Sequence, residues 1–168
     1  MSHAVETMAR SRQAGDRAET AVLELVDGLR YVPDSEGQHY DAVAETVIVP
    51  HRELPFVGIC LLEADAVVEI KSVAVVYGQN QRRGRFSLRR VQHQSLLEEG
   101  GVYLFAVCTP NSREIIGMKV VPATQVDHLL ESVTDGWRTA GDGREDYSQL
   151  AWTRIFDSSE LRQRGDEL

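Results

Sequence analysis

Two nearly continuous apolar runs constrain the fold of this 168-residue chain more than any other feature of its sequence. They are Val67–Val76 and Val102–Cys108, and both are rich in β-branched or aromatic residues. Runs of this length and composition are typical of strands that lie inside a sheet rather than at its edge. We therefore expect a sheet with a buried centre.

The patterns around these runs alternate between helix and strand. The first expected elements are a helix from Asp16 to Leu29, a strand over Ala42–Val49 and a hairpin of Phe56–Leu62 with Val67–Val76. A loop over Tyr77–Phe86 and a helix from Ser87 to Glu99 come next, followed by strands over Val102–Cys108 and Glu114–Val121. The chain is then expected to form a short helix capped by Thr124 and a last strand, or alternatively a helix, with Leu150, Trp152 and Phe156. Pro33 ends the first helix and Gly100 the second. This order predicts a mixed-sheet α/β sandwich.

The length suits one domain, which we expect over residues 16–157, between a flexible segment at 1–15 and a tail at 158–168. No apolar run reaches the roughly 18 residues that a membrane helix needs, and the first residues are polar. We therefore expect a soluble, cytoplasmic protein that does not bind membranes. Cys60 and Cys108 lie in apolar runs and are expected to be buried free thiols.

The charge of the chain is unevenly distributed. Its 18 basic and 26 acidic residues give a formal charge of -8, which excludes a uniformly basic protein that coats nucleic acid. The segment Ser72–Leu97 nevertheless contains no acid and carries the arginines Arg82, Arg83, Arg85, Arg89 and Arg90. Arginines and a glycine beside an aromatic residue are a pattern expected for phosphate binding, and a solvated run of charge is the alternative.

Glu69 and Lys71 are two residues apart in the first apolar run, so in a strand they point to the same face. Charges in an interior strand need a partner, a metal or a water-filled cleft, so the pair is either a satisfied ion pair or an active site, although Glu-x-Lys is also common on solvated faces. Only Lys71 and Lys119 are lysines among the 18 basic residues, and Lys119 receives no role from the sequence. Gln92 shares the apolar stripe of its helix, which predicts a buried amide with hydrogen-bond partners, in a site or in the core.

Taken in order, these residues resemble the PD-(D/E)XK nuclease superfamily, which has the restriction-endonuclease-like fold. The resemblance covers roughly Asp16–Leu130, and within the superfamily it is closest to archaeal Holliday junction resolvases and related haloarchaeal or viral nucleases. It rests on Val68–Ser72, the loop Arg82–Phe86, the helix that begins with Arg89–His93, and the strand Gly101–Val107. It implies a mixed central sheet flanked by helices, in the order helix, three strands, helix, two strands and helix.

The resemblance also implies a metal-dependent DNA endonuclease that acts on branched DNA as a homodimer, in recombination or repair. Glu69 and the backbone carbonyl of Ile70 would bind Mg²⁺ or Mn²⁺ with a second carboxylate, and Lys71 would assist the attacking water. Gln92 would match a helix glutamine that touches the site in some relatives. The residues implied to contact DNA are Arg82, Arg83, Arg85, Arg89, Arg90 and His93.

One family residue is absent from its expected position. The family has an Asp near the start of the preceding strand, often after a proline, but here Pro55 is followed by Phe56, Val57 and Gly58. Glu53 or Glu24 are the candidates to replace it. Without a second carboxylate, the chain would be a catalytically inactive DNA-binding relative of the same fold. A further alternative is an acidic interaction domain whose arginine loop binds a protein.

Overall fold

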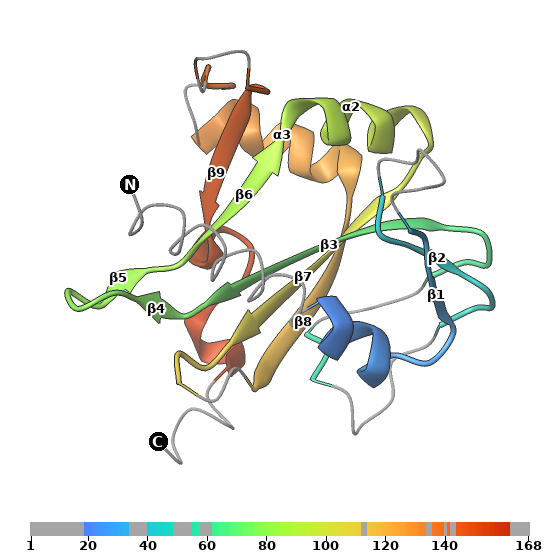
Figure 1. The fold of residues 1–168 in the computed structure, drawn as a ribbon, viewed down its shortest axis with the longest axis horizontal. Coiled ribbons are helices and arrows are strands. Elements are labelled where there is room, and N and C mark those ends of the chain that lie inside the picture. Colours follow the sequence, from blue (N-terminus) through green and yellow to red (C-terminus); the bar gives the residue numbers. More distant parts are fainter. Residues whose placement is uncertain are drawn as a thin grey trace.

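A five-stranded mixed sheet with the strand order β1-β2-β3-β7-β8 forms the centre of the molecule (Figure 1). The structure is a computed structural model that describes residues 19–33, 40–48, 55–57, 62–111, 114–133, 136–139, 141 and 144–161. β3 pairs antiparallel with β2 and parallel with β7, and β7 pairs antiparallel with β8. The predicted mixed-sheet α/β fold is therefore confirmed.

The elements of the structure follow the chain in a regular order after a helical segment at residues 19–25. They are β1 (Leu29–Tyr31), β2 (Ala42–Ala44), β3 (Val67–Ala74), β4 (Val76–Tyr77), β5 (Arg82–Arg83), β6 (Arg85–Arg89), α2 (Arg90–Glu98), β7 (Val102–Cys108), β8 (Ile115–Pro122), α3 (Ala123–Val133), β9 (Tyr147–Ala151) and the 3-10 helices η2 (Trp152–Arg154) and η3 (Ser158–Leu161). The strand predicted at Val102–Cys108 has these same bounds, and those of the next strand differ from the prediction by one residue. α3 begins at Ala123, so Thr124 lies inside this helix and does not cap it as predicted.

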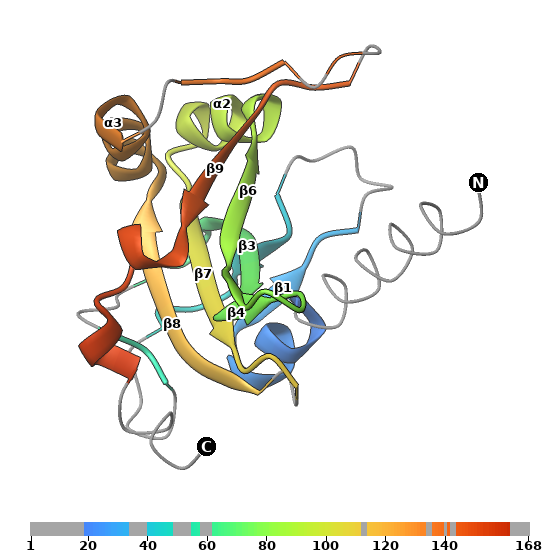
Figure 2. The ribbon, with the colours of Figure 1, turned by 90° about the vertical axis from the view of Figure 1, so that its left-hand side faces the viewer.

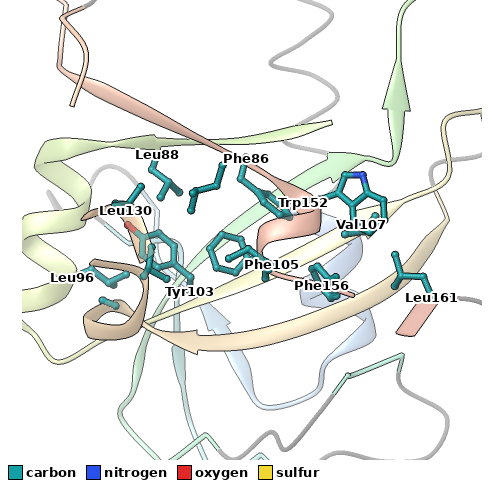
Figure 3. Packing of buried hydrophobic residues seen from close by; sticks show 14 of the residues in the cluster. Phe86, Leu88, Leu96, Tyr103, Phe105, Val107, Leu130, Trp152, Phe156 and Leu161 are labelled. Atoms are coloured by element: carbon teal, nitrogen blue, oxygen red, sulfur yellow. The ribbon is translucent and has the colours of Figure 1, made fainter. Parts of the chain in front are cut away.

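β7, an interior strand of the sheet, separates two apolar cores. Tyr103, Phe105 and Val107 belong to a cluster that includes side chains of β6, β9, α2 and α3 (Figure 3). Leu104 and Ala106, on the opposite face, belong to a second cluster with the N-terminal helical segment. In Figures 1 and 2, α2 and α3 lie together at one end of the molecule and the N-terminal helical segment lies at the other. Both faces of β7 are buried, so its residues are apolar without alternation.

The predicted hairpin of Phe56–Leu62 with the run from Val67 is wrong. The antiparallel neighbour of β3 is β2, with Ala42 opposite Val68. Phe56 instead forms a bridge with Met118, and Leu62 forms one with Ile48. The apolar content of a segment favours a strand but does not select its partner, because several apolar strands compete for each edge.

The first helix is shorter than its periodicity predicts. Helical residues end at position 25, and Leu29–Tyr31 form β1 against β2. Gly28 adopts a left-handed conformation with φ of 92° and accepts a hydrogen bond from Glu45 N–H. Glycine adopts this conformation without the steric cost of a Cβ, so it ends the helix and lets the chain turn into the sheet.

The predicted loop over Tyr77–Phe86 contains three short strands, and Ser87 lies in β6 instead of capping a helix. Arg85, Ser87 and Arg89 are exposed while Phe86 and Leu88 are buried, a period of two that indicates a strand. Gly84 permits the crossing between β5 and β6, because a Cβ there would collide with the backbone oxygen of Ala74. The helix then begins at Arg90 and ends, as predicted, before Gly100.

The C-terminal segment packs on the sheet through Lys119. Its Nζ donates a hydrogen bond of 3.0 Å to the carbonyl of Ile155 and lies 6.0 Å from the ring centre of Phe156. Leu161 is buried against Gly117, so the packed part of the chain extends past the boundary expected at residue 157. The last predicted strand is present as β9, whereas Trp152 and Phe156 follow it outside the strand.

Two further expectations concern the burial of the cysteines and the length of the helices. Cys108 is a buried free thiol, as predicted, whereas Cys60 and the segment at residues 1–15 lie outside the described residues. Within the described part of the chain, each helix is too short or too polar to span a membrane.

Phe105 is the test residue for the larger core. It is fully buried, and its ring centre lies 4.7 Å from that of Phe86 and 5.3 Å from that of Tyr103. We expect Phe105→Ala to lower the free energy of unfolding in urea by about 3–5 kcal/mol, because it leaves a cavity between these rings. Tyr77→Ala removes a half-exposed aromatic ring from β4 and should cost less than about 1 kcal/mol. Equal losses in the two variants would contradict this packing.

Candidate active site

Glu69 and Lys71 project from β3 on the face that carries α2. The register with β7 sets Glu69 opposite Tyr103 and Lys71 opposite Phe105, two residues of the larger core. Glu69 is 2% exposed, so its carboxylate lies inside the protein. The predicted interior strand thus carries a buried charge.

Lys71 connects this carboxylate to α2. Its Nζ lies 3.2 Å from Oε1 of Glu69 and donates a hydrogen bond of 3.2 Å to Oε1 of Gln92. Gln92 is buried, as its position on the apolar stripe predicts. Of the two possibilities for the glutamine, the structure favours contact with the site. Three of the residues implied by the resemblance therefore meet around one ammonium group.

Asp41 is a second carboxylate at this place, and the sequence analysis missed it. Its Oδ2 accepts a hydrogen bond of 2.8 Å from Ile70 N–H, and its own N–H donates one of 3.0 Å to the carbonyl of Val68. Asp41 directly precedes β2, which is the strand before β3 in the sheet. A carboxylate at the start of the Ala42–Val49 run was the available signal, and the wrong strand pairing hid it.

The buried carboxylate of Glu69 is electrostatically strained. Burial is the largest influence and raises its pKa from 4.5 to about 8, against the opposing effect of the Lys71 ammonium. The negative charges of Asp41 and Glu19 raise this pKa further. A cation close to these carboxylates would remove the cost of ionising Glu69.

The residues present fit a divalent cation. Oε2 of Glu69 is buried and has no hydrogen-bond partner among the described residues, while its neighbour Asp41 supplies a second carboxylate. Carboxylate and carbonyl oxygens are the donors that Mg²⁺ and Mn²⁺ prefer. In the described part of the chain, no group of three or more His, Cys, Asp or Glu side chains has the geometry of a complete metal site. The oxygen donors available to a cation are therefore the carboxylates of Glu69 and Asp41 and the backbone carbonyl of Ile70.

The two acids named as replacements for the family Asp do not occupy this position. Glu53 lies outside the described residues, and Glu24 is exposed on the N-terminal helical segment. The acid of that segment whose charge reaches Glu69 is Glu19. Residues 19 and 24 are five apart, which in a helix points their side chains in different directions.

His93 is not available for the predicted contact with DNA. Its side chain is 1% exposed, with Nδ1 2.9 Å from the hydroxyl of Tyr103 and Nε2 2.9 Å from Oδ1 of Asp127. The next residue along the helix from Gln92 thus faces the core between α2, β7 and α3. The periodicity of α2 shows which of its residues form the apolar stripe. It does not show that a polar residue at the edge of this stripe, here His93, is buried by another element such as α3.

The five predicted arginines are all exposed, and they fall into two groups. Arg89 lies 3.6 Å from Glu145, and Arg90 lies 3.1 Å from Asp146. In contrast, Arg82, Arg83 and Arg85 form no ion pair with any described residue. The positive charge left uncompensated is therefore concentrated on β5 and the start of β6.

Ionisation of Glu69 should make the stability of the metal-free protein depend on pH. Between pH 4.5 and about 8 the folded protein keeps a proton that the unfolded chain loses, so stability falls as pH rises through this window. Glu69→Gln removes this titration. We expect the variant to gain about 3 kcal/mol relative to the wild type from about pH 5 to about pH 8, measured by urea unfolding with a chelator. A difference that stays constant with pH would contradict the raised pKa, and Glu131→Gln, at an exposed site on α3, is the control.

Comparison with known proteins identifies the family. A family model described as the PD-(D/E)XK nuclease superfamily domain matches residues 5–157, a range that includes every residue of the site described above. Comparisons with curated proteins and with solved structures found no match. The family model covers most of the chain, and the mixed sheet is consistent with this family. The chain therefore belongs to the PD-(D/E)XK nuclease superfamily, and its domain is a nuclease domain.

Proposed function

We propose that the protein is a metal-dependent DNA endonuclease whose active site is built on Glu69, Lys71 and Asp41. The observation that carries the proposal is the buried Oε2 of Glu69, which has no hydrogen-bond partner among the described residues, with the carboxylate of Asp41 and the ammonium of Lys71 close by. A buried acceptor without a donor costs free energy, and active sites are places where such a cost is retained. Membership of a nuclease superfamily gives this arrangement its chemistry.

In this proposal Glu69, Asp41 and the carbonyl of Ile70 hold Mg²⁺ or Mn²⁺. The bound cation would polarise a phosphoryl oxygen and offset the negative charge that develops during hydrolysis. The Ile70 N–H donates to Asp41 and so fixes the orientation of that carboxylate beside β3. Glu19 is a nearby acid that adds negative potential at the same place.

Lys71 has the role of orienting the attacking water and stabilising the charge on the phosphate. Its ammonium is a compact charge with three donors on a flexible stem, in contrast to the planar guanidinium of an arginine. Gln92 accepts a hydrogen bond from Nζ and restrains it without neutralising it. In a chain with only two lysines, a lysine at this position is consistent with a demand for an ammonium.

The alternative of an inactive DNA-binding relative depended on the lack of a second carboxylate. Asp41 beside Ile70 removes that reason. The alternative of a protein-interaction domain depended on the arginine segment alone, whose uncompensated charges suit phosphates equally well. By resemblance to junction resolvases, we further propose branched DNA as the substrate and a homodimer as the active form.

A cleavage panel tests the proposed active site. The wild type should cut a labelled four-way junction with Mg²⁺ or Mn²⁺ more efficiently than linear or flapped DNA, and should sediment as a dimer. Glu69→Ala, Lys71→Ala and Asp41→Asn should each lose about 100-fold or more in single-turnover rate, because each removes a ligand or a charge from the reacting centre. Glu131→Gln, which alters an exposed acid on α3, should match the wild type.

The panel can also reject the proposal. Cleavage retained in both the Glu69 and Asp41 variants would overturn the assignment of the site. Metal-independent binding of DNA without cleavage of any substrate would favour the inactive relative.

A salt titration tests the arginines of β5 and β6. Replacing Arg82, Arg83 and Arg85 together by Gln should flatten the dependence of log Kd on log salt concentration by about 0.9 for each phosphate that the variant no longer binds. The measurement is fluorescence anisotropy with a labelled duplex in the presence of a chelator. An unchanged slope in the triple variant would mean that these residues do not contact DNA and would favour the interaction-domain alternative.

A further inference from the structure

We propose that a cavity on the outer face of the β6–β9 ribbon binds a backbone phosphate of DNA, at a place separate from Glu69 and Lys71. The cavity has a volume of about 450 Å³, and its lining includes Arg83, Arg85 and Arg154. This inference rests on the proposed function, since it assigns a second contact to the same nucleic acid. It adds Arg154, a residue that the sequence analysis did not connect with DNA.

The side chains of β6 and β9 alternate between the core and the outer face of the ribbon, and this alternation creates the cavity. Phe86 and Leu88 point into the larger core, so Arg85 points outward on the opposite face of the ribbon. The antiparallel register sets Arg85 opposite Ala151. Because the side chain of alanine is small, space remains above it beside the long side chain of the arginine. The cavity is thus a consequence of one small residue in the exposed row of β9.

Polar groups surround an apolar floor. Leu150, Ala151 and Val133 supply the apolar part of the lining, and Val133 comes from the end of α3. Gln149 and Thr153 add side chains that can donate hydrogen bonds to an oxygen of a ligand. Arg154 follows in η2, where the chain turns after β9. The cavity therefore offers donors from three strands, β5, β6 and β9, and from a 3-10 helix.

The charge of the lining favours an anion. Among the described residues of the lining, its three arginines are accompanied by no acidic residue. Arg83, Arg85 and Arg154 also form no ion pair with any residue that the structure describes, in contrast to Arg89 and Arg90 in the same region. Guanidinium groups bind phosphate oxygens in a bidentate manner, and several of them around one cavity repel one another until an anion is bound.

The position of the cavity favours the backbone of a bound duplex over an unrelated anion. Val76, which pairs with Arg83, is five residues beyond Lys71 in the chain. The backbone positions of Lys71 and Val76 therefore lie at most about 17 Å apart. One strand of duplex DNA advances about 3.4 Å for each nucleotide, so about five base pairs cover this span. Arg83, which lines the cavity, is therefore within the length of a short duplex from Lys71.

The test compares Arg154→Gln with Arg30→Gln by DNA-binding anisotropy in a chelator over a range of salt concentrations. Both variants lose one exposed arginine, but Arg30 lies on β1 and pairs with Glu45. Arg154→Gln should weaken binding about fivefold at 0.15 M salt and lower the salt slope by about 0.9, as expected for one phosphate contact. Arg30→Gln should bind like the wild type, and Arg154→Lys should keep the salt slope. Circular dichroism and Tm establish that each variant is folded.

Several outcomes would overturn the inference. Wild-type affinity and slope in Arg154→Gln would reject the cavity as a DNA contact, while cleavage by the wild type would still support the proposed function. If titration with inorganic phosphate shifts the Arg154 side-chain NMR signal but Arg154→Gln leaves DNA binding unchanged, the site takes a free anion and the assignment to DNA is wrong. If Arg154→Gln lowers the slope and the wild type does not cleave DNA, the nuclease proposal fails and the cavity assignment stands.

Discussion

The burial of the Glu69 carboxylate in an interior strand is the constraint on which the site depends. Burial makes the charged form costly, and the carboxylate retains an oxygen without a donor among the described residues. Lys71 offsets part of this cost, but Asp41 and Glu19 add to it. An arrangement optimised for stability alone would replace these groups with apolar residues of similar size. The acids around the ammonium of Lys71 are consistent with the cation site proposed above.

The fold holds these groups through its hydrogen-bonded strands and one helix. β3 fixes Glu69 and Lys71 through its pairing with β7, and Asp41 is held by two hydrogen bonds to the backbone of β3. α2 contributes Gln92, and the contact of His93 with Tyr103 and Asp127 anchors that helix on β7 and α3. The buried histidine therefore supports the position of its neighbour Gln92 instead of meeting the solvent. Precise placement of reacting groups requires such support from rigid elements.

The two lysines and the arginines lie in different electrostatic environments of the protein. Lys71 serves the buried site, whereas Lys119 binds the C-terminal segment to β8 through a backbone carbonyl. The arginines of β5, β6 and η2 lie outside, where three of them surround a cavity whose described lining residues include no acid. A net charge of -8 is thus compatible with a nucleic-acid partner, since the positive potential is concentrated on one ribbon.

Local patterns in the sequence were sufficient to predict the fold class, the strand at Val102–Cys108, and the position of Glu69 and Lys71 on one face of a strand. This is because an apolar run or a period of two depends on the local burial of side chains. They also predicted that Gln92 would be buried, since its spacing from two leucines is a property of one helix. Strand partners depend instead on contacts between distant segments, and this is why the hairpin was wrong and Asp41 was missed. The enclosure of His93 by α3 and the cavity at Arg154 likewise arise only when separate elements pack together. The sequence alone identified Glu69 and Lys71 on one face of β3, and the tertiary structure decided which carboxylate lies beside them and which arginines line the cavity.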